Sequence, residues 1–340
     1  MHRSRDLPTK PPIDRMRDSA AHSKLLRLPP LHGNCLASRK PDWNRSALMH
    51  RRCPLCGRDD PALICLRPDG LPVVTCEICG MTYVAEAPST ENLEGFYREY
   101  NRPKGYNGRR LPRWLCHLEW LLSPYCSILE ETGGIAGFRI ADVGCSFGRF
   151  LQVLRAKGAD VTGIELDEEA LKFLESIGIP ACRRVGRREL DVICALQLIE
   201  HVLDPASFVE AASQSLHEGG RLLLSLPNAA GLEEVGPAWI GFRVDLEHIN
   251  YFTCRTLAEL LAMSGLYIEH YWEHGQPAIG QGKSLFSALI KRGLATLFQS
   301  PSFADGTYVL TVLARKARRG RDAQVRAIRS PFVEPVYGSS

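Results

Sequence analysis

From Phe138 onward, short apolar runs alternate with amphipathic stretches, and this rhythm constrains the fold of the chain more than any other feature. Parallel strands that crossover helices cover on both faces give such a pattern. It predicts an α/β fold with a doubly wound, mostly parallel, seven-stranded sheet. We expect strands at 138–143, 160–165, 191–195, 221–226, 266–271 and 307–314, a weak strand near 180–184, and helices near 148–157, 168–177, 205–217 and 255–264.

The composition excludes several classes of protein. Its 340 residues are 45% hydrophobic and 24% charged, which is ordinary for a soluble globular protein. A net charge of +4 is too small to indicate nucleic-acid binding. No apolar run approaches the roughly 18 residues of a membrane span, and the N-terminal residues do not form a signal-peptide pattern. Twelve cysteines without such a pattern point to a reducing compartment, so we expect a cytoplasmic protein.

The chain divides into five parts by composition and pattern. Within the α/β part, an amphipathic pattern at 283–298 predicts a helix. This helix could pack on its own domain, cover a ligand site on that domain or make peripheral contact with a membrane. The five parts are a disordered basic tail (1–50), a cysteine module (51–86), a helical connector (87–136), the α/β domain (137–315) and a second disordered tail (316–340).

The cysteine module holds two C-x-x-C-G knuckles, Cys53–Cys56 and Cys76–Cys79, separated by nineteen residues. Each knuckle lets two thiolates meet one ion while the glycine allows a tight turn, so the pair completes a tetrahedral shell. The intervening sequence ALICLRPDGLPVVTC predicts a hairpin with its turn at Pro-Asp-Gly. We interpret the module as a small zinc ribbon. Its metal is expected to be structural because four protein ligands leave no open position.

The stretch ADVGCSFGRF (141–150) follows the first predicted strand of the α/β domain and contains Gly144-x-Ser146-x-Gly148. This pattern suits a hydrolase's nucleophile turn, and it also suits a turn whose backbone approaches a cofactor. A hydrolase turn normally has several strands before it, and this one has a single strand. The next predicted strand ends in Glu165, about twenty residues on, where a carboxylate binds the ribose of a nucleotide-like cofactor. We therefore expect a cofactor-binding turn and no nucleophile at Ser146.

Asp142-Val-Gly-Cys-Ser-Phe-Gly148 resembles the first motif of class I S-adenosylmethionine-dependent methyltransferases, an acid followed by G-x-G-x-G, with Ser146 in place of the middle glycine. Three later segments are similar to segments of these enzymes: DVICALQLIEHVLDP (191–205), LHEGGRLLLSLPN (216–228) and EHINYFTCRTLAELLAMSGL (247–266). The resemblance covers roughly residues 138–271. It implies a Rossmann-like fold with S-adenosylmethionine as the cofactor. The ribbon is similar to one found in a subset of these enzymes that modify sugars or cell-surface polysaccharides.

The resemblance also implies a role for individual residues. Asp142 would serve the methionine ammonium group, and Glu165 would bind the ribose. Gly144, Cys145 and Gly148 would allow the close approach of the backbone to the cofactor. The segment CRRVGRREL (182–190) is short and lacks the acidic loop that often holds the adenine, so it identifies no adenine contact.

Two histidines beside acids follow predicted strands, Glu200-His201 after 191–195 and Glu247-His248 after 221–226. Loops at the carboxyl ends of parallel strands line the ligand crevice, and a histidine has a suitable pKa for a base. We expect His248, with Glu247, His201 and Tyr251, to form the acceptor side. A structural role for His201 in closing its strand–helix turn is an equal alternative.

These patterns indicate a methyltransferase that acts on oxygen or carbon of a small-molecule acceptor, with a sugar or glycoconjugate as the favoured class. One alternative is an RNA methyltransferase with the ribbon as its recognition module. The sequence CALQLIEH (194–201) and the lack of a basic, aromatic stripe in the ribbon count against it. The other alternative is a non-catalytic zinc-ribbon binding protein with a degenerate methyltransferase domain.

Overall fold

The computed structural model describes residues 47–101, 107–184, 186, 189–244, 246–274 and 308–318. The predicted helix at 283–298 lies outside these residues, as do the greater parts of the two predicted tails. The last residues of the first tail are ordered, since β1 (Leu48–His50) pairs antiparallel with β5 (Glu86–Pro88).

The central sheet has the strand order β12-β13-β10-β9-β6-β7-β8. The five strands from β10 to β8 run parallel, and β13 pairs antiparallel with both β10 and β12. The predicted Rossmann-like, mostly parallel, seven-stranded sheet is thus confirmed. Its strands are β6 (Arg139–Val143), β7 (Asp160–Ile164), β8 (Ala181–Cys182), β9 (Leu190–Leu196), β10 (Leu216–Pro227), β12 (Leu266–His274) and β13 (Val309–Lys316).

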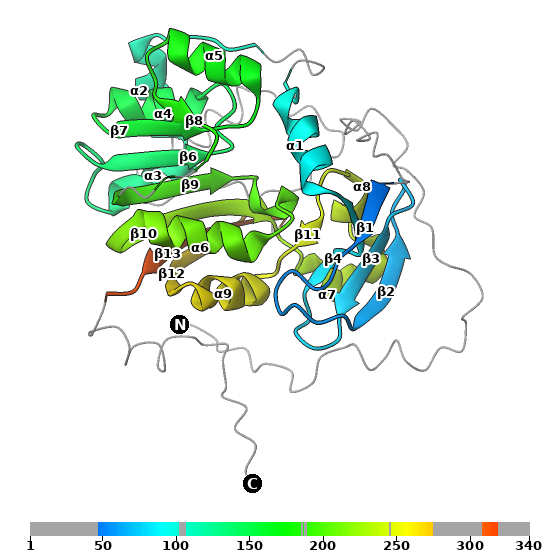
Figure 1. Cartoon of the computed structure of the whole chain (residues 1–340). Helices are drawn as coiled ribbons and strands as arrows, with labels where there is room; N and C mark the ends of the chain where they lie inside the picture. The colour runs from blue at the N-terminus through cyan, green and yellow to red at the C-terminus, as the bar shows by residue number, and fades with distance from the viewer. Residues whose placement is uncertain are drawn as a thin grey trace.

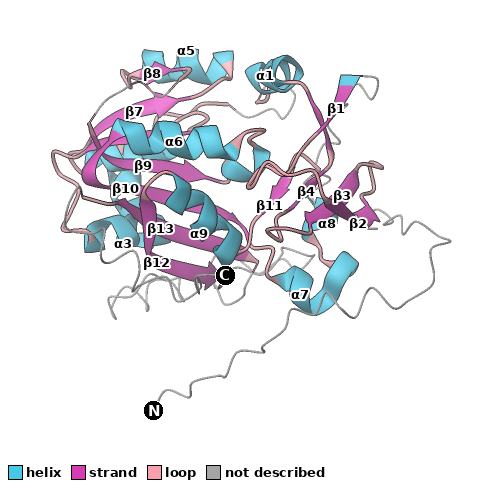
Figure 2. Cartoon of the chain, turned by 60° about the horizontal axis from the view of Figure 1, so that its bottom comes forward, coloured by secondary structure: helices cyan, strands magenta, loops and turns pink. Residues whose placement is uncertain are grey.

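Helices cover both faces of this sheet (Figures 1 and 2). Their starts follow from local sequence: Asp167 caps one helix by accepting from the Ala170 N–H, and Asp204 caps another by accepting from the Ser207 N–H. One face carries α2 (Arg113–Leu122), α3 (Pro124–Glu131), α4 (Arg149–Ala156) and α5 (Glu168–Ser176), whose apolar residues share a buried cluster. The other face carries α6 (Pro205–Ser215) and α9 (Cys254–Met263).

The predicted connector forms α1 (Thr90–Arg98), α2 and α3. Pro124 begins α3, and Ser123 caps that helix. Proline suits the first turn because its missing N–H has no intrahelical partner there. Helix α1 stands apart from the other two, between the central sheet and the ribbon (Figure 1).

The ribbon sheet contains a strand from the α/β domain. Its order is β11-β4-β3-β2, in which the predicted hairpin supplies β2 and β3. Strand β11 comes from the segment after β10, and it pairs with β4. That segment also contributes Trp239 and Phe242 to an apolar cluster with ribbon residues. The expected boundary between ribbon and α/β domain is therefore crossed by shared hydrogen bonds and a shared core. The elements are β2 (Pro61–Leu66), β3 (Pro72–Cys76), β4 (Thr82–Val84), β11 (Asn250–Tyr251), α7 (Gly231–Val235) and α8 (Gly241–Val244).

Gly148, at the start of α4, allows a stability test with a matched control. A Cβ at Gly148 would lie 2.3 Å from Cδ2 of Leu174, whose side chain is fully buried, whereas a Cβ at Gly178 would meet no atom within 4 Å. Both glycines have positive φ, 64° and 68°. We expect alanine at either site to cost about 1–2 kcal/mol through backbone strain. Gly148→Ala should lose a further 1–3 kcal/mol or so through overpacking. Equal free energies of unfolding for the two variants in denaturant titrations would contradict this account.

Candidate functional site

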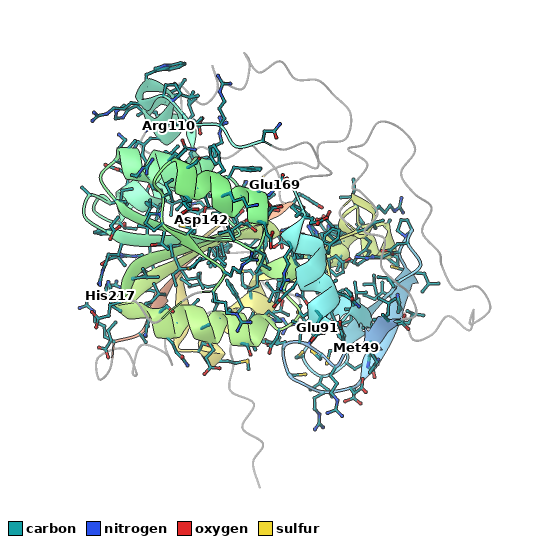
Figure 3. The ribbon with its side chains drawn as sticks, turned by 45° about the horizontal axis from the view of Figure 1, so that its top comes forward. Met49, Glu91, Arg110, Asp142, Glu169 and His217 are labelled. Carbon is teal, nitrogen blue, oxygen red and sulfur yellow. The ribbon has the colours of Figure 1, made fainter. Side chains whose placement is uncertain are left out.

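The predicted cofactor residues all lie at the carboxyl edge of the central sheet, at the ends of β6 and β7. Asp142 is in β6, and Figure 3 shows it in the interior of the domain. The turn after β6 folds back onto β7, because the Gly144 N–H donates to the Ile164 carbonyl at 2.8 Å. Gly144 has φ of 74°, a conformation that favours glycine. Glu165 follows β7 directly, so the structure brings it beside the turn.

Glu165 closes the glycine turn through its carboxylate. One oxygen accepts from the Ser146 N–H at 2.7 Å, and the other accepts from the N–H groups of Leu166 and Asp167 at 2.6 and 3.0 Å. The Ser146 hydroxyl donates to Oδ1 of Asn101 at 3.3 Å and thus has an amide partner, not an imidazole. This arrangement agrees with the expectation that Ser146 is no nucleophile.

Gly144, Gly148 and Cys145, the other residues of the predicted turn, have different surroundings. A Cβ on Gly144 would lie 3.0 Å from Leu198, the residue that follows the end of β9 by two positions. Gly148 instead lets α4 pack on Leu174 of α5, so packing is the reason for glycine there. The side chain of Cys145 is buried in the apolar cluster, which leaves only its backbone to face a ligand.

Asp142 is buried, and its burial raises the pKa of its carboxyl to about 8, with the nearby negative charge of Glu165 as a smaller cause. The ionised form of such a carboxyl favours a nearby cation, because the positive charge offsets the desolvation that burial imposes. It suits the ammonium group that the resemblance assigned to it.

Two non-glycine residues of the described chain have positive φ, Ser146 at 46° and Gln197 at 55°. Both follow strands of the same sheet edge, β6 and β9. Strained backbone of this kind concentrates at functional sites. Gln197 could not be predicted from the sequence, because nothing in its residue type signals a left-handed backbone.

The two histidines that we predicted for the acceptor side lie close together. The ring centroids of His201 and His248 are 4.6 Å apart in an edge-to-face arrangement, and Glu200 Oε1 lies 4.0 Å from Nε2 of each. Three hydrogen bonds explain why these distant segments meet. The Ile249 N–H donates to the Glu200 carbonyl at 2.9 Å, and the Asn250 side chain donates to backbone carbonyls on the other segment.

Helix α1 and the residues just after it add two tyrosines to this cluster. The Tyr97 hydroxyl is 3.0 Å from Nδ1 of His201, and the Tyr100 hydroxyl donates to Oε2 of Glu247 at 2.6 Å. Sequence reasoning placed both in a connector and missed them. Their three-residue spacing, which puts side chains on one side of a helical turn, is the signal that was available.

His248 is set up to be neutral. Burial lowers the pKa of its imidazole well below the ordinary value, and the positive charges of His201 and Arg67 lower it further. A neutral imidazole accepts a proton or binds a metal. Glu200 Oε1 lies 4.0 Å from Nε2 of His248, and the ligand atoms of Glu200, His201 and His248 lie within 4.8 Å of one another, so the arrangement suits either role.

We expected Tyr251 to face this cluster, but its side chain points elsewhere. Its side chain is buried against Trp239 and Phe242, and its hydroxyl accepts from Arg67 at 3.0 Å and donates to the His248 carbonyl at 3.3 Å. Tyr251 therefore packs in the shared core and supports the backbone of the loop that carries His248. Its strand position explains this, because β11 pairs with the ribbon and turns the side chain into the shared core.

The four knuckle cysteines converge as predicted. Sγ of Cys53 is 3.5 Å from that of Cys79, Sγ of Cys56 is 3.6 Å from that of Cys76, and all four atoms lie within 4.8 Å of one another. Bonds of about 2.3 Å to a tetrahedral zinc ion place sulfurs roughly 3.8 Å apart, so the donor set fits that ion. The glycines after the two knuckles have φ of 72° and 73° and donate to Cys53 and Cys76 carbonyls at 2.9 Å.

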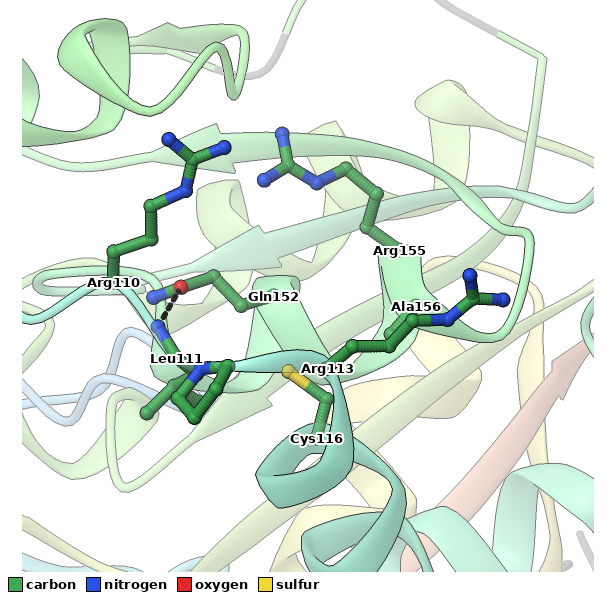
Figure 4. A pocket seen from close by; sticks show the side chains of 8 residues that line it. Arg110, Leu111, Arg113, Cys116, Gln152, Arg155 and Ala156 are labelled. Carbon is green, nitrogen blue, oxygen red and sulfur yellow. Dashed lines mark hydrogen bonds between the residues drawn. The ribbon is translucent and has the colours of Figure 1, made fainter.

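One pocket lies elsewhere, between the start of α2 and α4 (Figure 4). Arg110, Arg113 and Arg155 line it, and Gln152 accepts from the Leu111 N–H there. None of the predicted site residues lines this pocket. Arg155 is already engaged, because it donates to two carbonyls at the end of α5.

Part of the chain is similar to proteins of known family. Residues 116–271 match the family model described as "Methyltransferase domain". A ubiquinone biosynthesis O-methyltransferase of Idiomarina loihiensis is 30% identical over 114 residues, which are 30% of this chain and 47% of the relative. The corresponding protein of Leptothrix cholodnii is 35% identical over 115 residues, 29% of this chain and 49% of the relative. The chain thus spans about half the length of these curated relatives.

Among solved structures, an S-adenosylmethionine-dependent methyltransferase from Mesorhizobium loti is similar, with 22% identity and a TM-score of 0.42. The similarity covers 57% of this chain and 98% of that one. Within the part of the chain that the structure describes, no helix has both the length and the apolar character needed to cross a membrane.

Replacing one knuckle cysteine tests the metal ligands. We expect Cys76→Ser to lose one metal ion per chain and to lower the melting temperature, because metal binding stabilises the folded ribbon. Cys254→Ser is the control, since Cys254 lies outside the four-sulfur cluster. Elemental analysis of the purified proteins measures the metal, and full retention in Cys76→Ser would show that the ligands are misassigned. Because β11 belongs to the ribbon sheet, we expect the loosening to extend into residues 246–251.

Proposed function

We propose that this protein is an S-adenosylmethionine-dependent methyltransferase that acts on a small-molecule acceptor. The observation that carries the proposal is the glycine turn after β6, which the Glu165 carboxylate closes beside the buried Asp142. It lies at the carboxyl edge of a doubly wound sheet, where such folds bind ligands. The match of residues 116–271 to a methyltransferase domain supports the same reading.

Each residue of the edge has a part in holding the cofactor, which supplies an activated methyl group when bound. Asp142 would attract the ammonium of the methionine part, and Glu165 would accept hydrogen bonds from the ribose hydroxyls. Gly144 keeps the backbone free of a side chain at the turn. Asn101, which donates its N–H to the buried Asp167 and accepts from Ser146, would fix the connector over this turn.

On the acceptor side, His248 is the proposed base. It is neutral because it is buried, and Glu200 lies close enough to stabilise the imidazolium that forms when it takes the acceptor proton. His201, held by Tyr97, would orient the same acceptor. Glu247, held by Tyr100, would accept a hydrogen bond from an acceptor hydroxyl.

The acceptor class rests on several observations. The matched relatives are named for O-methylation in ubiquinone biosynthesis, which supports oxygen of a small molecule as the acceptor atom. A sugar or glycoconjugate, suggested by the ribbon, gains no support from those names. The two alternatives also have observations against them. Strand β11 covers one edge of the ribbon sheet, which leaves less of the ribbon available to recognise RNA. The contact between His201 and His248 is an observation against a degenerate domain.

Cofactor binding gives the direct test, measured by isothermal titration with S-adenosylhomocysteine. We expect Glu165→Ala to weaken binding about ten- to a hundredfold, since a charge-assisted hydrogen-bond pair is lost. Ser146→Ala should bind nearly as the wild type does. Gly144→Val should not bind, because its side chain would meet Leu198 at the turn. Glu169→Ala, a substitution of an exposed glutamate on α5, is the control. Failure of the metal-loaded wild type to bind would overturn the proposal.

The pKa of Asp142 predicts a pH dependence of cofactor binding. In the free protein its carboxyl has a pKa of about 8, so it carries a proton at pH 7. A bound ammonium favours the ionised form and lowers that pKa, so binding should release a proton. Affinity for S-adenosylhomocysteine should therefore rise with pH, by up to about tenfold per unit, until it levels off near pH 8. Titrations in buffers of different ionisation enthalpy count the proton. Asp142→Asn should abolish the pH slope, and an unchanged slope in that variant would exclude Asp142 as its source.

A further inference from the structure

Arg67 lies in the hairpin turn of the ribbon, and its side chain is completely buried. A buried guanidinium needs partners for its donors. Asp69, two residues on, supplies a paired carboxylate at 2.5 and 3.2 Å. This pair keeps Arg67 charged in the interior and fixes the direction in which its remaining donors point.

The remaining donors of Arg67 point at one loop of the α/β domain. They reach the Leu246 carbonyl at 2.8 Å, the His248 carbonyl and the Tyr251 hydroxyl at 3.0 Å. The two carbonyls flank Glu247 on either side. A single ribbon side chain thus holds the backbone from which the acceptor-side residues Glu247 and His248 project.

The ribbon turn does not need this guanidinium for its own closure. The Arg67 N–H donates to the Leu71 carbonyl at 3.0 Å, and the Gly70 N–H donates to the Arg67 carbonyl at 2.8 Å. The Asp69 carboxylate also accepts from the Leu71 N–H. Backbone bonds and Asp69 close the hairpin, while the guanidinium donors beyond Asp69 all go to residues 246–251.

We propose that Arg67 is the positioning residue of the acceptor-side loop, so that the metal ribbon forms part of the catalytic unit. The proposal rests on the proposed function for the roles of Glu247 and His248, but its physical content is the fixed geometry of their loop. Arginine suits this position because its planar fork reaches several acceptors at once, whereas a lysine ammonium would reach fewer.

Arg51 provides a second and separate connection between the ribbon and this segment. It donates to the Ile249 carbonyl at 3.0 Å and to Oδ1 of Asn250 at 2.9 Å. Strand β11 is therefore held to the ribbon independently of Arg67. A change at Arg67 should release the loop before β11 and leave the strand pairing in place.

The test uses the full-length, metal-loaded protein and three variants: Arg67→Met, Arg67→Lys and the control Arg58→Met, which changes an exposed ribbon arginine. Hydrogen–deuterium exchange of a peptide covering residues 246–251 is measured together with metal content and binding of S-adenosylhomocysteine. We expect Arg67→Met to speed exchange about tenfold or more, because bonds from a charged donor are lost. Arg67→Lys should restore part of the protection. Arg58→Met should match the wild type, and all three should retain metal and S-adenosylhomocysteine binding.

The histidine ring gives a signature that a general loss of stability would not produce. His248 is surrounded by Glu200, by His201 with its partner Tyr97, and by Arg67 from the ribbon. Because both burial and Arg67 lower the pKa of His248, that pKa should rise toward its ordinary value in Arg67→Met. Nuclear magnetic resonance of ring-labelled histidine follows this titration in each variant. An unchanged pKa together with wild-type exchange in Arg67→Met would overturn the proposal.

If Arg67→Met fails to fold, Tyr251→Phe tests the same contacts. It removes one acceptor of Arg67 and leaves the ring to pack against Trp239 and Phe242. We expect a smaller, measurable increase in exchange of residues 246–250, and wild-type exchange would overturn the proposal. Failure of the proposed function shows differently: the wild type would not bind S-adenosylhomocysteine, whereas the exchange of the loop would still respond to Arg67.

Discussion

The pairing of β11 with β4 ties together two parts of the chain that the sequence presents as separate modules. Each backbone group in this pairing would otherwise need another partner, and buried groups rarely go without one. The ribbon sheet thereby gains an edge strand, and the α/β domain gains a fixed path for the segment after β10. His248 lies just before that strand, so the position of the acceptor-side imidazole follows from the pairing. The residues proposed to bind the cofactor do not depend on it in the same way, because Asp142 lies in β6 and Glu165 directly follows the neighbouring parallel strand β7.

Much of the central fold could be predicted from the sequence because its signals are local. Apolar runs that are buried on both faces identified the strands, and amphipathic stretches between them identified the helices. The two knuckles are recognisable from the spacing of their cysteines, and in the structure their four sulfur atoms lie within 4.8 Å of one another. The glycine turn and Glu165 were recognisable for the same reason, since the turn and the next strand are joined by a short helix.

What could not be predicted depends on contacts between distant segments. The acidic–histidine pairs at 200–201 and 247–248 were visible, but their meeting depends on Ile249 and Asn250, whose hydrogen bonds carry no sequence signature. The assignment of Tyr251 to the acceptor failed because a tyrosine in a short strand can face either side. Arg67 looked like an ordinary turn residue beside Pro-Asp-Gly, and only the structure showed it to be completely buried.

The contact between Arg67 and His248 also has a consequence for how the chain reaches its native state. The two residues are 181 positions apart, so this bond closes one of the long loops of the molecule. During synthesis the ribbon precedes the segment that it meets, and the bonds that close its hairpin join residues only a few positions apart. Strand β4 then has no β11 beside it, and the Arg67–Asp69 pair stays reachable by water, until the segment after β10 has been made. The charge of Arg67 and the loop proposed to act on the acceptor are therefore buried together, once a segment made 181 residues later reaches the ribbon.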